Sequence, residues 1–135
     1  MIQRIQSLYL FIVTALFVSL FFTNFVVVNE IEYSVTDSVF MIIITSVIAL
    51  LALGTIFCFN NRTLQVRVSI FNMVLMLGWY AMAAFVTYKD LGTIFWSGDM
   101  KIVLTFPLIS IILDYLAIRG ILKDDALVKS YDRLR

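Results

Sequence analysis

Residues 38–59, SVFMIIITSVIALLALGTIFCF, form the most apolar segment that carries no charged side chain. A helix of this length, rising 1.5 Å per residue, crosses the ~30 Å hydrocarbon core of a bilayer. Thr45, Ala49 and Ala52 recur at i, i+4 and i+7 and form a face of small side chains. Such a face lets a neighbouring helix approach closely. The stretch therefore predicts a membrane-spanning helix that packs against another helix.

Comparable apolar stretches occupy residues 7–28, 68–88 and 102–122. The first has a rival interpretation as a cleavable signal peptide, whose apolar core is about 7–15 residues long and ends in small residues. Residues 7–28 continue to Val28 without such a site, which favours an uncleaved span. The short connection at 60–67 forces its two flanking spans into a helical hairpin.

The two longer gaps between the apolar stretches differ in character. Residues 29–37 hold Glu30, Glu32 and Asp37 and no cation, and we predict either a short extended piece or a plain loop. Residues 89–101 hold Phe95 and Trp96 between glycines. Aromatic side chains at the end of a span favour an interfacial belt over a ligand site.

Composition excludes several classes of protein. Hydrophobic residues make up 62% and charged residues 14%, against roughly half and a quarter in soluble domains. The net charge of +1 argues against nucleic-acid binding, which needs a concentrated basic surface. The sequence has no histidine and Cys58 is its one cysteine, which excludes an intramolecular disulfide and four-ligand Cys/His zinc sites. It has no glycine-rich phosphate loop or Ser/His pair, so we expect neither an enzyme nor a bound cofactor.

The basic residues predict the orientation of the four spans. If the N-terminus faces the cytoplasm, eight cations lie on that side and two, Lys89 and Lys101, lie on the other. The eight are Arg4, Arg62, Arg67, Arg119, Lys123, Lys129, Arg133 and Arg135. This asymmetry follows the positive-inside rule. We therefore predict one all-α membrane domain, an antiparallel bundle of four transmembrane helices with short connections, with both termini in the cytoplasm and a helical cytoplasmic tail at 123–135.

Three segments carry a family resemblance. They are MIQRIQ at residues 1–6, Asn61-Arg62-x-x-Gln65-x-Arg67 between the second and third spans, and the closing segment KDDALVKSYDRLR at 123–135. In these segments the chain resembles a family of small four-span bacterial membrane proteins of unknown function. The resemblance covers essentially the whole chain and implies a bacterial inner-membrane location. It implies no reaction, ligand or catalytic residue.

The one acidic residue inside a predicted span is Asp114. An ionisable group inside a membrane is a candidate functional site. Pro107, Ser110, Asp114 and Ala117 follow one another at spacings of three and four, so we expect this face to turn into the bundle. Asp114 lies five residues before Arg119, roughly 7–8 Å along the helix and therefore nearer the cytoplasmic headgroups than the midplane. The candidate polar site comprises Asp114, Ser110, Asn72 and Arg67.

Two interpretations of Asp114 remain open from the sequence. The first is a structural ion pair or hydrogen bond at the inner edge of the bundle, with Arg67 or Arg4 as the partner. Arg119, five residues on, lies well round the helix and is a poor partner. The second is a proton- or cation-coupling site.

The tail repeats apolar residues at helical spacing. Leu127, Tyr131 and Leu134 recur at i, i+4 and i+7, and Asp125 and Lys129 form a favourable i,i+4 pair. Gly120 marks a candidate bend. We predict a helical tail, and two alternatives remain open for it. Either its apolar stripe contacts lipid or protein, or the tail is a helix end surrounded by water. The candidate docking residues are Arg62, Gln65, Leu127, Tyr131, Arg133, Leu134 and Arg135, although helix capping and phosphate-headgroup contacts also explain the polar residues at this end.

Two functions of different classes follow from these features. The first is an accessory or structural subunit of a larger inner-membrane assembly, which binds a partner protein through its lipid-facing helices and its tail. The alternative is a small oligomeric transporter or channel that uses Asp114. The expected partners are the lipid bilayer and either another membrane protein or further copies of this chain, with no nucleic acid.

Overall fold

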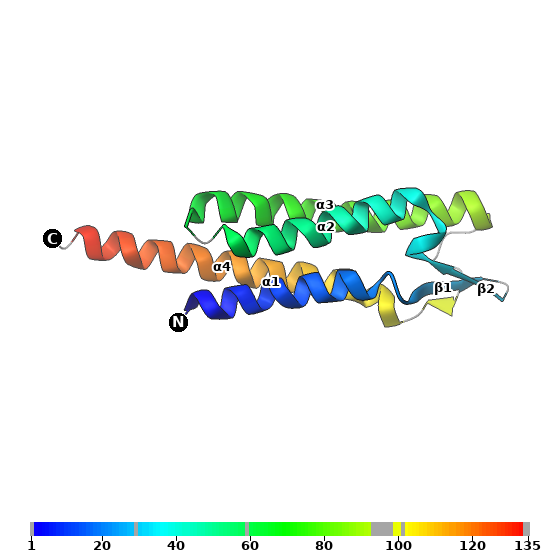
Figure 1. Ribbon diagram of the computed structural model, residues 1–135, viewed down its shortest axis with the longest axis horizontal. Helices are drawn as coiled ribbons and strands as arrows, with labels where there is room; N and C mark the ends of the chain where they lie inside the picture. The colour runs from blue at the N-terminus through cyan, green and yellow to red at the C-terminus, as the bar shows by residue number, and fades with distance from the viewer. Residues whose placement is uncertain (1, 29, 59, 93–98, 101, 134–135) are drawn as a thin grey trace.

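The computed structural model describes residues 2–28, 30–58, 60–92, 99–100 and 102–133. Within these residues the chain forms four α-helices, α1 (Ile2–Ser19), α2 (Val39–Phe57), α3 (Arg62–Leu91) and α4 (Phe106–Arg133). They lie side by side and run alternately toward and away from a small sheet at one end, while both termini lie at the other end (Figure 1). Both α1 and α3 pack against α2 and against α4. The prediction of four helices is confirmed.

Each helix buries one narrow seam of side chains. Along every seam the buried positions alternate in steps of three and four residues, a period of 3.5. This period is typical of helices that cross at about 20° and supercoil gently to the left. Because Thr45, Ala49 and Ala52 are buried, as are Pro107, Ser110, Asp114 and Ala117, both predicted packing faces are confirmed. The seams are Gln6, Leu10, Val13, Phe17 and Leu20 on and just after α1; Met41, Thr45, Ile48, Ala52 and Thr55 on α2; Gln65, Ser69, Asn72, Met76, Trp79, Ala83 and Val86 on α3; and Pro107, Ser110, Asp114, Ala117 and Ile121 on α4.

Outside the seams, large apolar side chains are exposed along all four helices. Phe11 is 60% exposed, Leu50 67% and Leu77 60%. The accessible surface, 8421 Å², exceeds the about 7,200 Å² of a compact monomer of this mass. Two helical segments, Val39–Phe57 and Arg62–Lys89, are long and apolar enough to cross a membrane, and Ile5–Ser19 is a shorter apolar helix.

A three-stranded antiparallel sheet replaces the end of the first predicted span. The strands are β1 (Asn24–Val28), β2 (Ile31–Ser34) and β3 (Asp99–Met100), in the order β2-β1-β3. Val28 pairs with Ile31, and Val27 pairs with both Glu32 and Asp99. Of the two alternatives for residues 29–37, the extended piece is confirmed for β2. Glu30 has a φ of 69° in the turn between β1 and β2.

The prediction of one helical span over residues 7–28 is wrong in its second part, because α1 ends at Ser19. The hydroxyls of Ser19 and Thr23 donate to backbone carbonyls of the last helical turns, at 2.6 Å to Leu16 and 3.0 Å to Ser19. The apolar run then continues as Val26, Val27 and Val28, whose β-branched side chains favour strand. The length of the segment without charged residues therefore did not distinguish a helix from a strand at residues 20–28.

Both ends of the third helix and the course of the fourth differ from those predicted. The third helix begins at Arg62, where the side chain of Asn61 accepts a hydrogen bond from the Leu64 N–H at 3.3 Å, so the connection is shorter than 60–67. It ends at Gly92, whose φ of 73° is the left-handed conformation typical of a helix C-terminus. The last helix runs unbroken through Gly120, so the predicted bend there is wrong.

Tyr80 joins α3 to the beginning of α4. Its hydroxyl donates to the Leu104 carbonyl at 2.6 Å and accepts from the Leu108 N–H at 3.0 Å. Pro107 precedes that N–H as the second residue of α4, where a missing N–H is tolerated because it would have no intrahelical partner. Pro107 therefore begins the helix instead of kinking it.

Candidate functional site

A cluster of polar side chains is buried between α3 and α4. Asp114 and Ser110 are fully buried on the α4 seam, one helical turn apart. Ser69 and Asn72 of the α3 seam are each 1% exposed and lie close enough to interact with the Asp114 carboxyl. Two seams with the same 3.5-residue period thus bring four polar side chains together, and we call them the polar cluster.

The polar atoms of this cluster lack hydrogen bonds. Both carboxylate oxygens of Asp114, both amide atoms of Asn72 and the hydroxyl oxygens of Ser69 and Ser110 are buried and meet no partner with hydrogen-bond geometry. Ser69 and Asn72 lie close enough to the Asp114 carboxyl for a weak polar contact, but not with the geometry of a well-formed hydrogen bond. Because buried polar groups are normally hydrogen-bonded, a set of unsatisfied groups needs a specific explanation, such as a bridging water or ion.

Other polar residues of the same seams are satisfied. The Trp79 indole donates to Thr45 Oγ1 at 2.9 Å, and Gln65 Nε2 donates to the Thr55 carbonyl at 3.1 Å. Thr55 in turn donates to the Leu51 carbonyl at 2.6 Å. The lack of hydrogen bonds is therefore particular to the polar cluster and to Gln6 Nε2, among the described residues.

Arg67 does not belong to the cluster. Its side chain is exposed and lines an outer groove with Arg62 and Asp125, so the prediction that Arg67 pairs with Asp114 is wrong. The heptad spacing explains this, because Gln65 and Ser69 occupy the seam and Arg67 lies between them on the opposite side of α3. The side chain of Arg4 lies outside the described residues.

The last part of α4 projects beyond the other three helices (Figure 1). Leu127 is 46% exposed and Tyr131 73% exposed, and Lys129 Nζ lies 3.2 Å from Asp125 Oδ2, as predicted. Arg133 is exposed as well. Leu134 and Arg135 lie outside the described residues.

Gln65 is not available for docking, because it is 5% exposed and bonded to α2. Arg62 is half-buried at the groove beside Asp125. The predicted docking residues therefore separate into a projecting helix end and a groove at its base, with Gln65 belonging to the core. Phe95 and Trp96 of the predicted aromatic belt lie outside the described residues.

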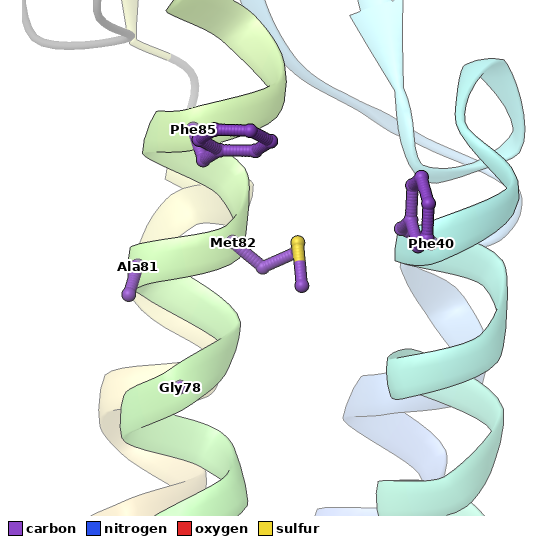
Figure 2. Close-up of a pocket in the computed structure, with 5 residues that line it drawn as sticks. All are labelled: Phe40, Gly78, Ala81, Met82 and Phe85. Carbon is purple, nitrogen blue, oxygen red and sulfur yellow. The ribbon is translucent and has the colours of Figure 1, made fainter.

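A shallow apolar groove opens between α2 and α3 near the sheet. It has a volume of about 310 Å³ and is lined by Phe40 of α2 and by Gly78, Ala81, Met82 and Phe85 of α3. Figure 2 shows Met82 pointing from α3 toward α2, with Gly78 below it on α3 and Phe40 on the facing side of α2. A Cβ added at Gly78 would meet nothing within 4 Å.

A family model described as a domain of unknown function, DUF4293, matches residues 2–134. The chain belongs to the DUF4293 family. The predicted resemblance to a family of unknown function is thereby confirmed as far as membership of such a family is concerned. No curated protein and no solved structure matches the chain.

The polar cluster of this DUF4293 chain offers one carboxyl, one amide and two hydroxyls. These groups bind protons, water or hard cations through oxygen, whereas transition metals prefer nitrogen and sulfur ligands. Within the described residues, no group of three or more His, Cys, Asp or Glu gathers to hold a metal ion. The cluster is therefore suited chemically to a proton, a water molecule or a single hard monovalent cation.

Two features of the DUF4293 chain were not predicted from its sequence: Ser69 in the polar cluster and the contact between Gln6 and Gly120. Ser69 lies at the same 3.5-residue spacing as Asn72, so the seam of α3 could have identified it. The contact between Gln6 and Gly120 joins α1 to α4, and no local pattern predicts it. A Cβ at Gly120 would lie 3.1 Å from Gln6 Nε2.

Proposed function

We propose that the protein is a multi-pass protein of the bacterial inner membrane and an accessory subunit that holds a partner protein. The membrane part of the proposal is supported by the exposed apolar surface on every helix. A soluble monomer rarely exposes a continuous apolar patch larger than a few hundred Å². Lipid covers such a surface without cost, and the small and polar residues within the seams of α2, α3 and α4 are of the kind that helices use to pack in lipid.

Charge supports an orientation with both termini in the cytoplasm. At the end where the termini lie, the described residues include Arg62, Arg67, Arg119, Lys123, Lys129 and Arg133, whereas Lys89 is near the sheet. In this orientation the basic end faces the cytoplasm, in agreement with the positive-inside rule. The sheet and its acidic turn then lie on the outer side of the membrane.

The accessory role is carried by one observation, the continuation of the α4 seam past the other helices. The seam positions Ala117 and Ile121 are buried, and the next positions at the same spacing are Asp124, Val128 and Tyr131. Val128 is 43% exposed and Tyr131 73% exposed. A face that neighbouring helices cover inside the molecule is thus uncovered outside it, which is the arrangement expected where a partner helix continues the packing.

The apolar groove between α2 and α3 supports a second contact within the membrane. Small side chains at Gly78 and Ala81 allow close approach of another transmembrane helix. A Cβ at Gly78 meets nothing within 4 Å, so this position has open space on the groove side into which a larger side chain can extend. We expect Gly78→Leu to fold normally and to weaken the partner complex.

Site-specific photocrosslinking in the source membrane tests the accessory role. A photoreactive phenylalanine analogue at Tyr131 should give one crosslinked species of constant mass, whose identity mass spectrometry establishes. The matched control is the same analogue at Ala126, which is exposed on the opposite side of α4. Equal crosslinking from both positions, or none from Tyr131, would count against a docked partner.

A second candidate function, a small oligomeric transporter or channel, is favoured by the polar cluster alone. A fully buried carboxyl without a hydrogen bond is a candidate site for a coupling proton or cation. Proteoliposomes with an imposed pH or sodium gradient should then show a flux that Asp114→Asn abolishes and that Ser46→Ala, a change in α2 outside the polar cluster, leaves intact. Equal flux in the wild type and in Asp114→Asn would exclude this role.

A further inference from the structure

A second groove runs between α1 and α4 at the end of the molecule where the termini lie. It has a volume of about 300 Å³ and is lined by Ile5, Gln6, Tyr9, Leu116, Arg119, Gly120 and Lys123. Along it, Leu116 and Tyr9 lie toward the middle of the helices, and Arg119 and Lys123 lie toward the termini. We call it the α1/α4 groove.

The charges of the α1/α4 groove are cationic and unpaired. Arg119 and Lys123 are exposed and stand one turn apart on α4, about 5–6 Å between their Cβ atoms. The ion pair found further along α4 joins Lys129 to Asp125, and neither Arg119 nor Lys123 is paired within the described residues. None of the lining residues is acidic.

The floor of the groove holds a polar donor without an acceptor. Gln6 is 5% exposed and lies against Gly120, and its Nε2 is buried without a hydrogen bond. Leaving a buried N–H unsatisfied is costly. An acceptor-only group beside Arg119 and Lys123, reached by a small turn of the Gln6 side chain into the groove, removes that cost.

We propose that the α1/α4 groove binds the phosphate of one anionic phospholipid. Arg119 and Lys123 hold the phosphate oxygens, Gln6 donates its free N–H, and an acyl chain lies along Leu116 and Tyr9. Arginine and lysine are the residues that bind phosphate groups, and the apolar inner half of the groove matches the lipid tail. The proposal rests on the membrane embedding proposed above and not on the accessory role.

The groove on the other side of α4 provides a matched comparison. It has a volume of about 280 Å³ and also holds two cations, Arg62 and Arg67, but it includes the carboxylate of Asp125. No unsatisfied buried donor lines it within the described residues. The carboxylate repels a phosphate, so this groove should bind anionic lipid more weakly.

Native mass spectrometry of the purified protein in a neutral detergent tests the proposal. The probes are phosphatidylglycerol, phosphatidylcholine of the same chain length, and sn-glycerol 3-phosphate as the soluble source of the same phosphate chemistry. We expect one phosphatidylglycerol to bind preferentially. The doubly substituted Arg119→Gln, Lys123→Gln protein should lose affinity by roughly fivefold for each cation removed, whereas Arg62→Gln, Arg67→Gln should change it by less than twofold.

A variant that keeps all charges tests the role of Gln6 separately. Gln6→Met has a similar volume and no N–H, so it should keep the monodisperse elution of the wild type while it lowers phosphatidylglycerol occupancy. Equal occupancy in the wild type and the Arg119, Lys123 variant, or equal binding of phosphatidylcholine, would overturn the proposal. Binding of glycerol phosphate as tight as that of the lipid would show a free-phosphate site instead.

A protein that stays monodisperse without detergent would refute the membrane embedding itself, and loss of the Tyr131 crosslink would bear only on the accessory role.

Discussion

The Trp79–Thr45 pair and the polar cluster lie on the same set of seams but differ in how their polar groups are satisfied. Near the sheet, Trp79 and Thr45 are hydrogen-bonded to each other within an apolar cluster that includes Phe17 and Met41. Near the termini, Asp114 and Asn72 are as deeply buried and make no hydrogen bond. In the first region the buried polar groups bond to each other, whereas the groups of the polar cluster need a bridging water, a proton or a ligand to complete their hydrogen bonds.

The largest expected effect is on the sheet side, at Trp79. Trp79→Ala removes a fully buried ring and leaves a cavity, which costs about 3–5 kcal/mol of unfolding free energy. Reversible unfolding in mixed micelles with increasing SDS measures it. A loss below about 1 kcal/mol would show that this half is not the rigid core.

The next effect comes from the hydrogen bond inside that core. Thr45→Val keeps the shape of the side chain and leaves the Trp79 N–H without its acceptor, at a cost of about 1–3 kcal/mol. The same SDS titration measures it. The control is Ser46→Ala, which removes a hydroxyl bonded only to its own helix at Ile42 and should change stability by less than ~0.5 kcal/mol.

Asp114 should respond in the opposite direction. Asp114→Leu removes two unsatisfied buried oxygens, so we expect the free energy of unfolding to rise by about 1–3 kcal/mol, and Asp114→Asn to change it less. If both variants are instead destabilised and fail to accumulate in the membrane, the Asp114 carboxyl stabilises the fold. The two regions would then not differ in the way proposed.

The smallest effect is expected at Ser110. Its hydroxyl makes no hydrogen bond, and Ser110→Ala exchanges it for a better helix former, a gain of no more than ~0.5 kcal/mol. Comparing Ser110→Ala with Thr45→Val in one titration tests the difference between the two regions most directly. A loss at Ser110 as large as that at Thr45 would mean that the polar cluster is bonded after all.

Periodicity in the sequence predicted most of the helical architecture and part of the site. The small face of Thr45, Ala49 and Ala52 is buried, and Pro107, Ser110, Asp114 and Ala117 turn inward together. Spacing along one helix determines which side chains share a face, so these predictions needed no tertiary information. The end of α1 at Ser19 was missed because a charge-free run rich in valine suits a strand as well as a helix.

Contacts between helices could not be predicted in the same way. Arg67 and Asp114 are both charged residues near one end, yet Arg67 points outward, because the seam of α3 passes through Gln65 and Ser69. Gly120 marks no bend and instead makes room for Gln6 of α1. These features depend on how two helices are rotated about their axes relative to each other. Rotating one helix by the angle between consecutive residues, about 100°, would bring a different set of its side chains to the interface.

The sequence alone determined the number of helices, the inward faces of α2 and α4 and the concentration of basic residues toward one end, because these depend on composition and on local spacing. Only the tertiary structure decided which polar groups meet. It brought Ser69 and Asn72 close to Asp114 without well-formed hydrogen bonds, placed Gln6 on Gly120, and left the α4 seam uncovered beyond its neighbours. The physical reason is that helix ends and helix rotations are set by the packing of all four seams together, which no single stretch of the chain contains.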